Sequence, residues 1–255
     1  MAAWLRELIR AGHLPKGEVD EGSIEEVRPA DLRGFGQCHF FAGIGGWVRA
    51  LRLGRRGAEP SVWTGSCPCG PWSIAGRRRG TADSRDLWPI WLALIDECRP
   101  ATLFGEQVAG RAGRAWLSRL QTDLERVGYG VAGADLCAAG VGAPHIRPRL
   151  YWLAHSERQG RQGGQPAKLR GARRRPEGGE PFQLGSVPGP WTRLSLIKVG
   201  GKVRVIEPGI DPLAHAVPGR MVMLRGYGNA IVPELGAAFV RAAFEAIGEG
   251  RGEHV

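Results

Sequence analysis

Apolar positions in the first 156 residues of this 255-residue chain alternate between short runs and helical spacing. Short apolar runs predict buried strands, and apolar residues three or four apart predict helices that cover them. The expected strands are 38–41, 61–64, 102–105, 131–136 and 150–154. The expected helices are 1–12, 47–53, 87–98, 115–127 and, near the C-terminus, 235–247. Such alternation is typical of an open α/β sheet with helices on both faces.

The alternating pattern stops at about Ser156. Residues 157–181 are rich in glycine, arginine, glutamine and proline, with almost no large apolar side chain, so they cannot order themselves. They are either a flexible linker or a basic arm that settles on phosphates, and we expect a mixture of the two. Beyond them, 194–199 and 202–206 flank Gly200-Gly201 and predict a β-hairpin. We expect three parts: a main domain with an N-terminal extension (1–155), a small basic insertion with a hairpin (156–208) and a C-terminal segment returning to the main domain (209–255).

Charge narrows the range of partners. The chain carries 35 lysines and arginines against 25 acids, a formal net charge of +10. Such an excess favours polyanions, of which nucleic acid is the commonest, although a generally basic solvated surface gives the same count. An odd number of cysteines, no signal peptide and no long apolar run indicate a reducing, cytoplasmic setting without membrane contact. Because no second cysteine or histidine pair accompanies Cys67-x-Cys69, we expect no metal site.

A glycine-rich turn, Phe41-Ala42-Gly43-Ile44-Gly45-Gly46, separates the first expected strand from the helix at 47–53. Glycines let a ligand approach the backbone closely, and the helix N-terminus adds positive potential. The spacing differs from the dinucleotide fingerprint and from the phosphate-binding P-loop. Taken alone, the turn is a weak signal, because many such turns only connect a strand to a helix.

Cys69 lies in a loop punctuated by prolines and glycines, which follows the expected strand 61–64. A lone intracellular cysteine is usually a small buried hydrophobe. Here Pro68 and Pro71 bracket it, and this predicts a rigid, exposed turn. A thiolate in such a turn is a candidate nucleophile.

Two further positions carry groups that could assist attack by a sulfur atom on C6 of a cytosine. Such an attack pushes charge toward N3 and O2 of the ring, so it needs an acid near N3 and a cation near O2. Glu106, after the expected strand 102–105, is the candidate acid, and Arg147 and Arg149, before the strand 150–154, are the candidate cations. Each alone is more often a solvated or surface-paired residue, but their occurrence together in this order favours a reactive site.

In this order the motifs resemble those of the cytosine-C5 DNA methyltransferases. Residues 41–46 are similar to that family's cofactor turn, and residues 65–76 resemble its catalytic loop, with Cys69 at the nucleophile. Gly80, Asp83, Arg85 and Leu87 match the motif that follows the family's catalytic loop. Glu106-Gln107-Val108 stands where the family has Glu-Asn-Val, and His145-Ile146-Arg147-Pro148-Arg149 stands where it has Gln-x-Arg-x-Arg. Gly228-Asn229-Ala230 resembles the family motif that folds back beside the methyl donor. The resemblance implies a reduced Rossmann-like sheet, with residues 156–208 as the target-recognition insertion.

The resemblance also implies an activity: methyl transfer from S-adenosylmethionine to C5 of a cytosine flipped out of double-stranded DNA. Cys69 would attack C6, Glu106 would contact N3, and Arg147 and Arg149 would hold O2 and the glutamate. The implied donor-binding residues are Phe41, Ala42, Gly43, Ile44, Gly45, Gly46, Pro68, Leu87, Asn229 and Ala230. The expected DNA contacts are Ser73, Arg77, Arg78, Arg79, Arg173, Arg174 and Arg175. We expect a monomer in the cytoplasm of a bacterial or phage-infected cell.

The chain departs from the family pattern mainly by an absence. Only 22 residues (47–68) separate the glycine turn from Cys69, where the family usually has two further strands with acids that hold the donor's ribose and adenine. Glu59 is the only acid in this gap, so we expect a smaller sheet, with Glu59 or the acidic stretch 18–31 holding the donor. Gly70, Gln107 and His145 replace the family's Gln, Asn and Gln.

Three alternatives remain open at this point. One is an RNA cytosine-5 methyltransferase of similar fold. Another is a non-catalytic nucleic-acid-binding protein whose donor binding is impaired by the missing strands. The third is C5 chemistry with a different transferred group.

Overall fold

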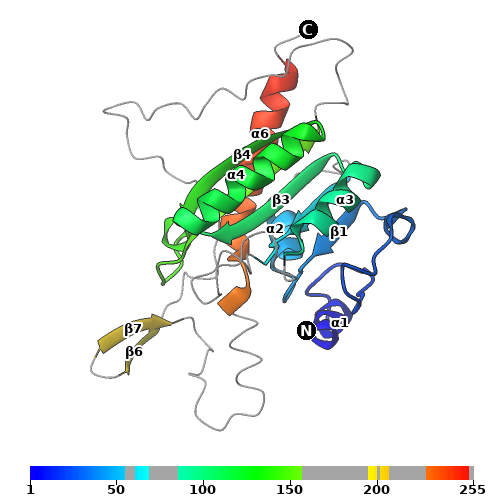
Figure 1. Ribbon diagram of the computed structural model, residues 1–255. Helices are drawn as coiled ribbons and strands as arrows, with labels where there is room; N and C mark the ends of the chain where they lie inside the picture. Colours follow the sequence, from blue (N-terminus) through cyan, green and yellow to red (C-terminus); the bar gives the residue numbers. More distant parts are fainter. Residues whose placement is uncertain (55–60, 69–85, 157–194, 200–201, 207–227, 253–255) are drawn as a thin grey trace, which may run out of the picture.

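The computed structural model describes residues 1–54, 61–68, 86–156, 195–199, 202–206 and 228–252, and it is built around a five-stranded mixed sheet (Figure 1). The strands are β1 (Gln37–Phe40), β2 (Val62–Gly65), β3 (Thr102–Val108), β4 (Tyr129–Cys137) and β5 (Pro148–Ser156), in the spatial order β1-β2-β3-β5-β4. The first three run parallel, whereas β5 is antiparallel to both β3 and β4. All five strands expected from the apolar runs are confirmed.

The expected helices are confirmed as well. They are α1 (Ala2–Arg10), α2 (Gly46–Gly54), α3 (Trp88–Cys98), α4 (Arg111–Arg126) and α6 (Pro233–Gly252), with short 3-10 turns at Pro29–Leu32 and Ala138–Val141. The expected hairpin forms from β6 (Ser195–Val199) and β7 (Lys202–Ile206), which pair antiparallel. In the part of the chain that the structure describes, no helix combines the length and the apolar character that crossing a bilayer requires.

Helices cover both faces of the sheet, because successive strand residues point to opposite sides. On one face Trp63 and Trp152 pack into a core with residues of α3 and α4. On the other face Val62, Phe104 and Tyr151 pack with residues of α2 and α6. In Figure 1, α4 accordingly lies in front of the sheet and α6 behind it. The expected α/β class is therefore confirmed.

Two glycines make room for indole rings directly before candidate site residues. A Cβ on Gly65 would lie 2.4 Å from Cη2 of Trp91, and a Cβ on Gly105 would lie 2.1 Å from Cε2 of Trp152. Both tryptophans are fully buried. Glycine in a strand interior often marks such a close approach, and here it brings the ends of β2 and β3 down onto the aromatic core.

The strand ends differ from the sequence-based expectation in a way that matters for the site. β3 continues to Val108 and β5 begins at Pro148, so Glu106 and Arg149 are strand residues and not loop residues. The reason is that the β3–β5 ladder extends to the pair Val108↔Arg149, past the apolar residues that marked the strands. At its other end β5 reaches Ser156, two residues beyond the strand end expected at residue 154.

β1 forms one edge of the sheet, and no described strand pairs with its outer side. The smaller sheet expected from the short gap before Cys69 is thus confirmed for the described residues. Part of the N-terminal extension packs on the sheet domain: Ile24, Val27 and Leu32 contact the core that contains Trp63 and Trp91, and the 3-10 turn at Pro29–Leu32 contacts α3.

Candidate active site

Three motifs that are distant in sequence meet at the carboxyl ends of β1, β2 and β3. Phe40 pairs with Gly65, and Gly65 pairs with Gly105. The glycine turn after β1, Ser66 after β2 and Glu106 in β3 therefore lie along one edge of the sheet. In open α/β sheets, ligands bind at this edge.

Glu106 is the central acid of this edge. It is only 7% exposed, and its Oε1 lies 2.8 Å from Nε of Arg149. Burial raises the pKa of Glu106, and the positive charges of Arg149 and Arg147 and a hydrogen bond from Ser66 oppose that rise. Ser66 is itself held, since Nε1 of Trp47 donates to its Oγ at 3.1 Å. The carboxyl group is thus fixed in position and more readily protonated than an ordinary glutamate.

Arg147 makes different contacts from Arg149. Its Nη2 donates to the carbonyl oxygens of Gly228 at 2.8 Å and Ala230 at 2.9 Å. Its positive charge also lowers the pKa of Glu106 and so opposes the rise that burial causes. Arg147 therefore ties the segment before α6 to the edge that carries Glu106.

Gln107 is a site residue that the sequence marked only as a departure from the family's asparagine. Its Nε2 donates to the carbonyl oxygen of Cys67 at 3.1 Å, and its Oε1 accepts from the backbone N–H of Val108 at 2.9 Å. It is 5% exposed. The available signal was a polar residue inside a buried strand end, because buried polar groups are nearly always hydrogen-bonded.

The glycine turn is sharply bent and open on one side. Phe41, Gly43 and Gly45 all have positive φ, and the N–H of Gly45 donates to the carbonyl of Ala42. A Cβ on Gly43 would meet nothing within 4 Å. A non-glycine residue such as Phe41 at φ +53° is uncommon, and such strain gathers at functional sites. The turn can therefore admit a ligand against the backbone at Gly43.

The C-terminal motif lies beside this turn. A Cβ on Gly46 would lie 2.8 Å from Cγ1 of Ile231, so the chain just after Asn229 and Ala230 packs against the start of α2. This contact and the hydrogen bonds of Arg147 place the Gly228–Ala230 segment next to both the turn and Glu106.

The remaining site predictions divide into two groups. Pro68 is exposed at the end of the described loop, and Leu87 packs half-buried against the core near α3. The predicted residues outside the described part of the chain are Glu59, Cys69, Ser73, Arg77, Arg78, Arg79, Arg173, Arg174 and Arg175.

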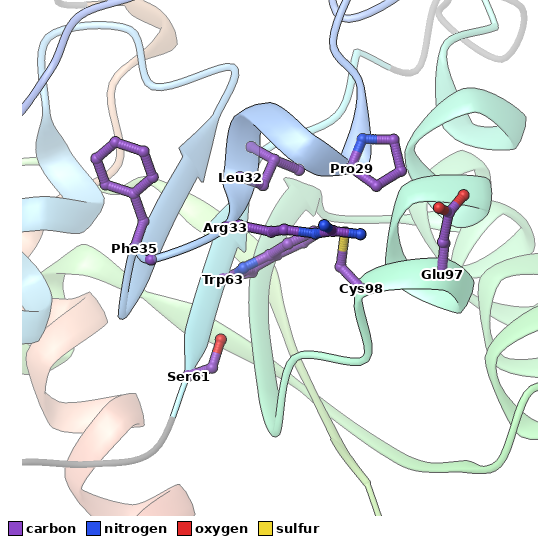
Figure 2. A pocket seen from close by; sticks show the side chains of 9 residues that line it. Pro29, Leu32, Arg33, Phe35, Ser61, Trp63, Glu97 and Cys98 are labelled. Carbon is purple, nitrogen blue, oxygen red and sulfur yellow. The ribbon is translucent and has the colours of Figure 1, made fainter.

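A cavity of about 300 Å³ opens at the opposite end of the sheet (Figure 2). Its lining includes Phe35 before β1, Ser61 before β2 and Cys98 at the end of α3. It is therefore distant from Glu106 and the glycine turn. Within the described residues, no group of three or more His, Cys, Asp or Glu is arranged to hold a metal ion.

Sequence comparison relates the chain to known proteins. The family model described as C-5 cytosine-specific DNA methylase matches residues 56–176. The Type II methyltransferase M.AplI of Arthrospira platensis is 35% identical over 99 residues, which are 38% of this chain and 29% of that protein. M.NaeI of Lentzea aerocolonigenes is 35% identical over 97 residues, which are 37% of this chain and 24% of that protein. The matches thus span less than a third of these curated relatives.

Among solved structures, the S. pombe Dnmt2 methyltransferase has a TM-score of 0.39 and 18% identity, covering 49% of this chain and 52% of that one. A likeness of this degree adds nothing to the assignment. The sequence matches confirm the resemblance that the motifs predicted: residues 56–176 are similar to the C-5 cytosine-specific DNA methylases.

Proposed function

We propose that the protein is a DNA (cytosine-5)-methyltransferase that uses S-adenosylmethionine. The observation that carries the proposal is the contact of the buried Glu106 carboxyl with Nε of Arg149 at the carboxyl end of β3, beside the end of β2. The chain leaving β2 reaches Cys69 directly after Pro68. An acid with a raised pKa, fixed by a guanidinium, is suited to stabilise a pyrimidine under nucleophilic attack.

In the proposed reaction the Cys69 thiolate forms a bond to C6 of the cytosine. The electron pair of the C5–C6 double bond moves toward C5, and the ring gains electron density at N3 and O2. Glu106 in its neutral form donates a hydrogen bond to N3, which its raised pKa favours. Arg149 orients the Glu106 carboxyl through Nε and, with Arg147, supplies positive charge near O2.

The residues at the glycine turn fit a donor with an extended, polar body. Gly43 faces open space, and the Asn229–Ala230 segment lies beside the turn. When bound there, S-adenosylmethionine supplies an electrophilic methyl group to C5. The donor would leave as S-adenosylhomocysteine; loss of the C5 proton to water and departure of the Cys69 sulfur would then restore the C5–C6 double bond and regenerate the thiolate.

We propose double-stranded DNA as the substrate, because the chain is strongly basic and its relatives are named as Type II methyltransferases. A cytosine in a duplex must leave the stack before a side chain can reach C6. The basic stretch 157–181 and the β6–β7 hairpin form the proposed target-recognition insertion. We further propose that the enzyme acts as a monomer in the cytoplasm.

The test is covalent trapping on duplexes of random sequence that contain 5-fluorocytosine. Fluorine at C5 cannot leave as a proton does, so the sulfur stays bonded and the adduct survives denaturing electrophoresis. We expect an adduct that requires S-adenosylmethionine. Cys69→Ser should abolish it, whereas Cys98→Ser, at the opposite end of the sheet, should retain it.

Other outcomes decide between the alternatives. An adduct with structured RNA but not with DNA would replace the DNA proposal with the RNA one. Duplex binding by folded protein, without an adduct on either nucleic acid, would overturn the enzyme proposal in favour of a binding protein. Mass spectrometry of the trapped base reports whether the transferred group is methyl.

A further inference from the structure

The N-terminal helix packs directly on the glycine turn. A Cβ on Gly45 would lie 2.7 Å from Cδ1 of Leu14 and 3.2 Å from Cδ2 of Leu5. Leu14 is 7% exposed, although the residues on either side of it in the chain are exposed. These two leucines therefore fill the space on one side of the turn.

The N-terminal segment is held as a unit behind this contact. After α1 the chain reverses at Gly12, and the backbone N–H of Leu14 donates to the carbonyl of Leu8 at 3.2 Å. Arg6 donates to the carbonyl of Val19 at 2.9 Å and forms an ion pair with Glu21. The acidic stretch that begins at residue 18 is thereby fastened to α1.

The turn is enclosed on two sides and open on a third. Leu5 and Leu14 lie against Gly45, Ile231 lies against Gly46, and Gly43 faces open space. β1 is the outer strand of the sheet, and no described strand lies beyond it. The N-terminal segment packs against the turn at Gly45, two residues from the open position at Gly43.

We propose that residues 1–21 form a wall of the donor pocket, in the place of the strands that the sheet lacks. The ligand class is the adenosyl group of S-adenosylmethionine, so this inference rests on the proposed function. Leu14 is a positioning residue here: it packs against Gly45 of the glycine turn, and the segment that carries it also carries the acidic stretch that Arg6 fastens to α1. If the segment lay on the surface without contributing to the pocket, mutations in it would leave donor binding unchanged.

The first test uses hydrogen exchange on the full-length protein, with S-adenosylhomocysteine as the probe. We expect the probe to slow exchange in residues 2–14 as well as in the turn at 40–47. Slowed exchange at 40–47 with none at 2–14 would overturn this inference and leave the proposed function standing. Absence of any binding by the wild-type protein would overturn both.

The second test compares two leucine variants by calorimetric titration with the same probe. We expect Leu14→Ala to weaken binding about tenfold, as lost apolar contact at the turn implies. Leu53→Ala is the matched control, because Leu53 is 40% exposed on α2. Equal affinities for the two variants would contradict the inference. Melting temperatures show whether each variant is folded. If Leu14→Ala is unfolded, the exchange experiment still tests the inference, because it uses only the wild-type protein.

Discussion

Replacing Gln107 with leucine tests whether the loop that leads to Cys69 is held from β3. The amide of Gln107 joins two backbone groups, the carbonyl of Cys67 at 3.1 Å and the N–H of Val108 at 2.9 Å. Leucine fills a similar volume but satisfies neither group. A buried polar group left without its partner costs about 1–3 kcal/mol.

The expected size of the effect follows from which group can find water. Val108 is 39% exposed, so its N–H can find water, whereas Cys67 is 2% exposed and its carbonyl stays without a partner unless the chain moves. Loss of the Cys67 contact then shifts the loop away from its held position by about 1–3 kcal/mol. That free energy lowers the held population by about five- to 150-fold.

The assay is the rate of adduct formation with 5-fluorocytosine DNA at saturating S-adenosylmethionine. Gln121→Leu is the matched control, since Gln121 is exposed on α4 and bonds only to Glu125 among the described contacts. We expect the Gln107 variant to lose at least fivefold in rate, as about 1 kcal/mol implies, and the control to keep the wild-type rate. If Gln107→Leu formed the adduct at the wild-type rate and had the wild-type melting temperature, the reasoning would be refuted.

Two further predictions concern the interior of β3. Because burial raises the pKa of Glu106, its neutral form favours the fold, and this contribution is complete below the pKa of an unfolded glutamate and is lost as pH rises through the folded pKa. Melting curves from about pH 4 to 8 should therefore show the wild type losing stability relative to Glu106→Gln as pH rises; a constant difference would contradict the raised pKa. Gly105→Ala should destabilise by about 3 kcal/mol or more in urea unfolding, because its Cβ overlaps the ring of Trp152. Trp152→Leu in the same chain should recover part of that loss, and strictly additive effects would disprove the overlap.

The sheet could be predicted from the sequence because each strand is recognisable from its own run of apolar residues. Apolar runs such as 102–105 and 150–154 must be buried, and their order with helices leaves few topologies. The same criterion ended β3 too early, because Glu106 and Gln107 are polar and a polar residue inside a ladder looks like a loop residue. Pairing with β5, more than 40 residues away, decides that they belong to the strand.

The sequence predicted which residues belong to the candidate site better than it predicted the contacts between them. The family pattern named Glu106 and Arg149, and the structure brings them to 2.8 Å. It did not indicate that Arg147 binds the carbonyls of Gly228 and Ala230, since a contact between residues so far apart leaves no local trace. Likewise, the apolar face of α1 indicates that the helix packs, but not that its partner is Gly45.

Arg147 donates hydrogen bonds to the carbonyls of Gly228 and Ala230, and Ile231 packs on Gly46. These contacts have a consequence for folding during protein synthesis. This side of the glycine turn is closed by residues that a ribosome adds only after all five strands of the sheet have been synthesised. A nascent chain that already displays the glycine turn and Glu106 still lacks this closure. Termination between residues 157 and 227 would leave a chain with all five strands but without α6 and without the carbonyl groups that Arg147 contacts.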